Sequence, residues 1–243
     1  MQPTPAGEAL LARAREVLGG LEHARNELSA FASGVQGSVP VLASPSVLAE
    51  HLPEDIASFP AQHPRIHIGL EERTGPAIVR GVREAAADVG VLWDSVDMAG
   101  LTVRAYRTDR LCVALPPTHA LARRSQLSFA QLLEQPLIGV IPGGQLDQLL
   151  RRQAALLGKL PIYRMQVSSL DAASRMVAAG LGLAILPREA ATPHAGAGRL
   201  ALVPLAQEWA VRRLVAVTRA GVALSPAAEL LVLALGRMAG PQS

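Results

Sequence analysis

The segment from residue 167 to residue 187 constrains the fold of this chain more than any other stretch. It has the pattern of a strand end, a helix that begins after Ser168 or Ser169, a helix stop at Gly180, and a second buried strand over residues 181–186. Serine is favoured before a helix because its hydroxyl accepts a hydrogen bond from an otherwise unpaired amide. Glycine ends helices because it adopts the left-handed conformation. A strand–helix–strand unit of this kind predicts an α/β protein, in which small ligands bind at the carboxyl ends of the strands.

The rest of the chain beyond Gly37 also alternates strands with helices, which is typical of a mainly parallel sheet. We expect strands near residues 38–43, 65–71, 88–92, 101–106, 110–115, 137–141, 162–167, 182–186, 200–204 and 213–218. We expect helices near residues 45–59, 75–86, 128–134, 144–157, 169–179 and 225–239.

The first segment, residues 5–33, has the pattern of one helix with an apolar seam that repeats in steps of four and three residues. Burying each large seam residue would contribute about 1.5–3 kcal/mol, so this helix should pack against a partner. We predict a dimer seam; the alternative is that the helix docks on its own domain. The seam residues are Leu10, Ala14, Val17, Leu21, Ala24, Leu28 and Phe31.

The composition predicts a protein with a large hydrophobic core that is located in the cytoplasm. Hydrophobic residues make up 50% of the chain, yet no apolar run approaches the roughly 20 residues that a membrane helix needs. The N-terminus lacks the basic and apolar regions of a secretory signal. The single cysteine, Cys112, lies in an apolar run and is expected to be a buried, unreactive thiol.

The net charge of +3 does not by itself predict a nucleic-acid interface. The basic residues are almost all arginines and are scattered, with Arg123-Arg124, Arg151-Arg152 and Arg212-Arg213 as the longest clusters. A nucleic-acid surface would need a continuous basic stripe or a reading motif. We therefore interpret the arginines as solvated surface residues.

Several motifs along the chain, together with the segment 167–187, resemble those of the LysR-type transcriptional regulators, and the resemblance extends over residues 3–240. These motifs are Thr4-Pro-Ala-Gly-Glu-Ala-Leu-Leu11, Leu52-Pro53, the strand 66–70, Ala87-Asp-Val-Gly-Val91, His119-Ala-Leu-Ala122 and Pro136-Leu-Ile138. The resemblance implies an α/β fold with two Rossmann-like subdomains of the periplasmic-binding-protein type, joined by two crossover strands and preceded by a long linker helix. It implies a linker and dimerisation helix over 1–36, one subdomain over 37–110 and 208–240, and another over 111–207.

The same resemblance implies that this chain is the effector-sensing and dimerising portion of a transcriptional regulator. It would bind a small molecule, for which we expect a carboxylate, and would form a homodimer or homotetramer. A winged helix-turn-helix should precede Thr4, and only three residues do. We therefore expect contact with promoter DNA only through a DNA-binding domain that this chain does not contain.

Four predicted helix starts could face one cleft, and the resemblance supports their use in effector binding. A helix N-terminus carries unpaired amides and about half a positive charge, which suits a carboxylate. The alternative is that these serines and threonines are ordinary caps and that the arginine is a surface residue. Ser169 and Thr74 are the strongest candidates among the predicted effector-binding residues, which are Ser44, Ser46, Arg73, Thr74, Gly144, Ser168 and Ser169.

No catalytic, metal or cofactor motif stands out, so we expect no enzyme activity and no cofactor. The serines lack a Gly-x-Ser-x-Gly elbow. The spacing of His63 and His67 around Pro64 does not favour a zinc site. We interpret His63 and His67 as ordinary surface residues; the other histidines are His23, His51, His119 and His194. The alternative functions are a solute-binding protein of a transport system and, third, a small-molecule enzyme.

Overall fold

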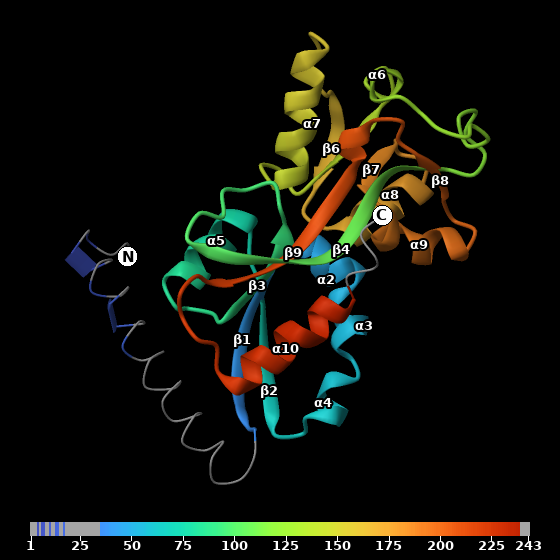
Figure 1. Cartoon of the computed structure of the whole chain (residues 1–243). Coiled ribbons are helices and arrows are strands. Elements are labelled where there is room, and N and C mark those ends of the chain that lie inside the picture. Colours follow the sequence, from blue (N-terminus) through green and yellow to red (C-terminus); the bar gives the residue numbers. More distant parts are fainter. Residues whose placement is uncertain are drawn as a thin grey trace. The chain divides into compact units, whose positions relative to one another are not determined.

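The computed structural model describes residues 35–238 together with residues 4, 6, 7, 10, 13, 14 and 17. The chain divides into two compact units (Figure 1). The first unit extends up to Leu48, continues over Leu52–Arg107 and includes the chain from Arg213 onward. The second unit comprises Ala49–His51 and Thr108–Arg212. The fold is therefore a mixed α/β fold in which the chain leaves the first unit, builds the second and returns.

The sheet of the first unit has the strand order β2–β1–β3–β9. Strand β1 (Gly37–Ala43) is parallel to β2 (Ile66–Glu72) and to β3 (Val89–Trp93), whereas β9 (Val211–Arg219) is antiparallel to β3. Helix α5 (Gly75–Arg83) packs on β1 and β3, and helix α10 (Pro226–Arg237) packs on β1 (Figure 1). The apolar core between α5 and the sheet consists of Leu42, Ile78, Val79, Val82, Ala87, Leu92, Val215 and Val217.

The predicted helix over residues 45–59 is wrong as a single element. The structure has three short helices instead: α2 (Pro45–Glu50), α3 (Leu52–Ile56) and α4 (Phe59–Gln62). Pro53 and Pro60 each lack an amide hydrogen, so neither residue can donate the hydrogen bond that a continuous helix requires. Val47 and Leu52 are buried in this region.

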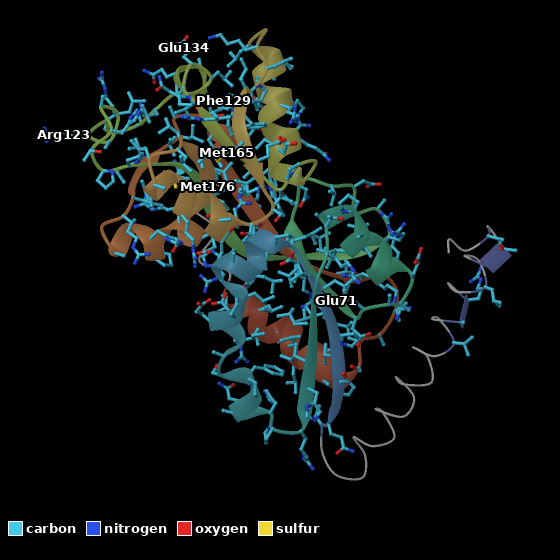
Figure 2. The ribbon with its side chains drawn as sticks, turned by 180° about the vertical axis from the view of Figure 1, so that it is seen from behind. Glu71, Arg123, Phe129, Glu134, Met165 and Met176 are labelled. Atoms are coloured by element: carbon cyan, nitrogen blue, oxygen red, sulfur yellow. The ribbon has the colours of Figure 1, made fainter. Side chains whose placement is uncertain are left out.

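The second unit contains two sheets. Strand β4 (Leu101–Leu115) belongs to this unit from Thr108 onward, and there it is antiparallel to both β7 (Ala184–Pro187) and β8 (Ala201–Pro204). Strand β5 (Leu137–Val140) is parallel to β6 (Tyr163–Val167). The helices of this unit are α6 (Phe129–Leu132), α7 (Gln145–Leu156), α8 (Leu170–Ala178), α9 (Arg188–Gly196) and the 3₁₀-helix η1 (Glu208–Ala210). Between α8 and the strands lies a core that includes Ile138, Ala173, Val177 and Leu186, with Met165 and Met176 packed against it (Figure 2).

Three details of the predicted sheet and helices are wrong. The sheets are mixed rather than mainly parallel, because β7, β8 and β9 run antiparallel to their neighbours. The two strands predicted over 101–106 and 110–115 form one 15-residue strand. In the middle of this strand Arg107 forms an ion pair with Asp55. Helix α9, which contains Pro193, was not predicted.

Of the predicted dimer seam, only Leu10, Ala14 and Val17 are among the described residues. All three are helical, and the side chains of Leu10 and Val17 are 71% and 63% exposed. Leu21, Ala24, Leu28 and Phe31 lie outside the described residues, so the linker helix and its seam stay a prediction.

Two predictions from composition can be compared with the structure. No helix among the described residues is long and apolar enough to cross a membrane. Cys112 is buried, as expected, and burial raises the pKa of its thiol to about 12.

Candidate functional site

In the first unit, the carboxyl ends of the parallel strands bring two of the predicted helix starts to one edge of the sheet. Ala43 at the end of β1 pairs with Glu72 at the end of β2 and with Val91 in β3. The amide of Arg73 donates to the carbonyl of Ala43 at 3.0 Å. Residues 44–46 and residues 73–74 therefore follow neighbouring strands at the same edge.

Ser44 is the most informative residue at this edge. Its amide donates to the carbonyl of Val91 at 3.0 Å, and its carbonyl accepts from the amide of Leu48 at 3.1 Å in the first turn of α2. The residue is only 2% exposed, and its hydroxyl oxygen has no hydrogen-bond partner within the part of the chain that the structure describes. Because buried hydroxyls are nearly always satisfied, this oxygen is well suited to a ligand or a water molecule.

The second helix start at this edge is Thr74, which precedes α5 in an extended conformation. Its side chain makes no capping hydrogen bond to the described residues, and Pro76 lies in the first turn of the helix. Thr74 is exposed, so its hydroxyl is accessible. Arg73 is less suited to a ligand, because its guanidinium donates to the carbonyl of Glu72 and forms an ion pair with Glu71, which is labelled in Figure 2.

In the second unit, Gly144 and the pair Ser168-Ser169 likewise follow neighbouring parallel strands. Val140 pairs with Val167, and the amide of Ile141 donates to the carbonyl of Val167 at 2.7 Å. The loop that leads to α7 and the serines that lead to α8 therefore lie at the same edge of the β5–β6 sheet.

The helix start at Gly144 already binds a carboxylate of its own chain. Asp147, in the first turn of α7, accepts from the amide of Gly143 at 2.9 Å and from Nε of Arg151 at 3.0 Å. Burial alone would raise the pKa of Asp147, but these two hydrogen bonds hold it below its usual value. Gly144 itself is required here, since a β-carbon would lie 2.9 Å from the carbonyl oxygen of Ile141. Gly144 is therefore a weaker candidate than the serines for binding an external anion.

Ser169, rather than Ser168, is the residue that caps α8. Its hydroxyl oxygen accepts from the amide of Ala172 at 3.1 Å. The hydroxyl hydrogen is not used in that bond, so Ser169 retains a donor at an exposed position. Ser168 is also exposed and directly follows β6. The helix ends at Gly180, which has the left-handed φ of 76° that the sequence predicted.

Sequence reasoning missed a buried cluster of charged residues in the second unit. Arg212 is 2% exposed, and it donates to Glu50 at 2.8 Å and through Nε to Asp109 at 2.8 Å. The interpretation of the arginines as solvated is therefore wrong for Arg212. Burial raises the pKa of Glu50 to about 8, although the Arg212 guanidinium opposes that effect.

His51, which is half-buried, adjoins this cluster. Its Nε2 atom is buried. One ring nitrogen of His51 and one carboxylate oxygen each from Glu50 and Asp109 all lie within 4.8 Å of one another. The only sequence signal for this arrangement is the adjacent pair Glu50-His51 at the end of an apolar helix.

Comparison with protein-family models identifies the family to which this chain belongs. A family model described as the LysR substrate binding domain matches residues 32–239. The chain belongs to the LysR family. The resemblance noted in the sequence is thereby confirmed over both units.

The relatives of this LysR-family chain include bacterial transcriptional regulators. A probable nitrogen assimilation transcriptional activator from Synechococcus elongatus is 26% identical over 217 residues, covering 88% of this chain and 70% of the relative. The transcriptional regulator CbbR from Xanthobacter flavus is 27% identical over 234 residues, covering 96% of this chain and 70% of the relative. The chain spans 62–70% of the length of the first relatives that it matches.

Solved structures confirm the fold. The Synechocystis CcmR regulatory domain in complex with 2-PG superimposes with a TM-score of 0.77 at 16% identity, covering 85% of this chain and 99% of that one. The BenM effector-binding domain with its effector benzoate gives a TM-score of 0.70 at 20% identity, covering 83% of this chain and 91% of that one. The two-subdomain fold expected from the sequence is therefore the fold of this LysR-family chain.

Proposed function

We propose that this chain is the effector-sensing and dimerising portion of a LysR-type transcriptional regulator, and that it binds a small carboxylate to control transcription. The match of residues 32–239 to the LysR substrate binding domain carries this proposal. The relatives that are named by function are regulators of transcription rather than enzymes. In the proposed whole protein, promoter DNA is bound by a separate DNA-binding domain, and the protein acts in the cytoplasm, where the chromosome lies.

The two compact units correspond in this proposal to the two regulatory subdomains. The expected subdomains, 37–110 with 208–240 and 111–207, are the two bodies that respond to the effector, and residues 1–36 form the dimerising linker. The effector biases the equilibrium between alternative arrangements only to the extent that it binds one of them more tightly. The readout would be the assembly of a homodimer or homotetramer.

The proposed effector-binding residues are Ser44, Ser46 and Thr74 on the first unit and, separately, Ser168 and Ser169 on the second, with Arg73 and Gly144 as weaker candidates. The buried hydroxyl of Ser44, which has no hydrogen-bond partner among the described residues, supports the first group. The accessible hydroxyls of Thr74 and Ser169 at helix starts support a ligand that carries negative charge. Benzoate and shikimate, which are bound by the related BenM and QuiR domains, are both carboxylates.

A calorimetric titration of the whole chain tests this site. A thermal-shift screen of small carboxylates, each beside its neutral amide or ester, would first identify a ligand; benzoate with benzamide is one such pair. We expect the carboxylate to bind and its neutral partner to bind at least tenfold more weakly, because a hydrogen bond to a charged group contributes about 1.5–3 kcal/mol and a neutral one about 1.

The Thr74→Ala, Ser169→Ala double variant should then bind that carboxylate at least tenfold more weakly than the parent. Ser128→Ala is the matched control, because Ser128 also caps a helix through its hydroxyl but precedes α6. Equal affinity in the parent and the double variant would remove the site assignment and leave the family assignment in place.

A further inference from the structure

The cluster around Arg212 leaves three polar atoms without hydrogen-bond partners among the described residues. They are Oε2 of Glu50, Nε2 of His51 and Oδ1 of Asp109. The side chains of Glu50 and Asp109 are 0% and 1% exposed, so water does not solvate their carboxylates. All three atoms belong to the second unit, and Arg212 binds the opposite oxygens of both carboxylates. The guanidinium thus holds one oxygen of each carboxylate, and the other oxygen of each has no partner among the described residues in the cluster that includes His51.

The charges of this cluster do not balance. Two ionised carboxylates against one guanidinium leave one negative charge in a buried place, which is unfavourable without a further cation or proton. A proton on Glu50 would remove that charge but would leave the nitrogen of His51 without a partner. A divalent cation would neutralise the excess negative charge and would also bind all three atoms that lack partners. It therefore explains both observations, whereas a proton on Glu50 explains only the first.

We propose that Glu50, His51 and Asp109 form a binding site for a divalent transition-metal ion, with Oε2, Nε2 and Oδ1 as its ligands. One imidazole and two carboxylates form a set typical of zinc and manganese rather than of calcium, which prefers oxygen ligands alone. Ligands at about 2.0–2.2 Å from an ion lie within about 4.4 Å of each other. One ligand atom from each of the three residues lies within 4.8 Å of the other two, and the half-buried His51 needs to move only slightly to complete the set.

A pocket of about 230 Å³ provides the entry path and the room for water as further ligands. His51 and Asp109 form part of its wall, and the same wall carries Arg110, Arg188 and Glu189. The side chains of Arg110, Arg188 and Glu189 are exposed, so solvent screens their charges, whereas the carboxylates of Glu50 and Asp109 are buried. The ion would connect Ala49–His51 to β4 close to residues 107–108 and 212–213, two of the four points where the chain changes units.

Metal titration of the whole chain after treatment with a chelator tests the proposal. We expect one Zn²⁺ per chain by calorimetry and elemental analysis, binding of Co²⁺ and Mn²⁺ at the same site, and at least tenfold weaker binding of Ca²⁺. X-ray absorption of the zinc complex should show nitrogen and oxygen ligands with one imidazole and no sulfur. A sulfur ligand would assign the ion to Cys112 instead and overturn the site.

Single substitutions of the three proposed ligand residues test whether the ion binds at this site. His51→Ala should weaken zinc binding at least tenfold, and it should leave the fold intact because His51 is only half-buried. Asp109→Asn and Glu50→Gln keep the shape of each side chain and should weaken binding similarly. His67→Ala is the matched control, because His67 is an exposed histidine on β2. Absence of stoichiometric zinc binding, or unchanged affinity in His51→Ala, would overturn the proposal.

Discussion

Arg212 and Glu50 are separated by 162 positions in the sequence and joined by a hydrogen bond of 2.8 Å in the interior of the second unit. Asp109 receives two further hydrogen bonds from the same guanidinium. One buried arginine thus holds together the end of α2, the middle of β4 and the start of β9. The stability of the second unit should therefore depend strongly on this side chain.

Replacing Arg212 with Met keeps most of the side-chain volume and removes the charge. Two buried carboxylates would then lack their partner, and loss of one member of a buried ion pair destabilises a protein by about 3–5 kcal/mol. Urea unfolding followed by circular dichroism measures the change. Arg213→Met is the matched control: its side chain is 81% exposed and lies 3.8 Å from Asp94, so the expected change is under about 0.5 kcal/mol. Equal stability of the two variants would contradict the structural role of Arg212.

The carboxylate of Asp147 at the start of α7 should make the stability of the protein depend on pH. The pKa of Asp147 is lowered in the folded protein, so its carboxylate stabilises the fold above its unfolded pKa near 3.8, and that contribution disappears as the pH falls through the lower folded value. Asp147→Asn should be less stable than the parent at pH 7. The difference in the free energy of unfolding between the parent and Asp147→Asn should decrease as the pH is lowered from 5 toward 2. A difference that stays constant over that range would contradict the lowered pKa.

Helix starts were predicted well because their chemistry is local. Ser169, Thr74 and Gly144 stand immediately before helices α8, α5 and α7, as the sequence indicated, and Gly180 ends α8. Each of these positions depends on a residue's own backbone preference and on amides within one turn.

Pairings between distant residues were not predictable from the single sequence. Nothing in the composition near Arg212 distinguishes it from Arg213, yet the first is buried and the second is not. In the same way, Arg107 in the polar middle of β4 pairs with Asp55, which lies far earlier in the chain. Asp147 is different: it lies four residues after Gly143, so its occupation of the α7 start could have been inferred from local spacing.

The two strongest effector candidates should differ in what they do for the fold. The hydroxyl of Ser169 caps α8, whereas Thr74 makes no such bond among the described residues. Ser169→Ala should therefore destabilise α8 by about 1 kcal/mol and speed amide hydrogen exchange in its first turn. Thr74→Ala should leave exchange in the first turn of α5 almost unchanged. Faster exchange in α5 for Thr74→Ala would show that its hydroxyl has a structural role and would weaken its assignment to the effector.

The N-terminal seam predicts association of the chain. Leu10 and Val17 are largely exposed in the single chain, and the heptad pattern continues to Phe31. Leu21→Glu with Leu28→Glu would place charges on this seam and should weaken assembly, whereas His23→Glu with Asn26→Glu adds the same residues off the seam and should not. Light scattering at micromolar concentration measures the mass. The parent should have at least twice the single-chain mass of 25.5 kDa, and a parent that scatters as a single chain would contradict the dimer.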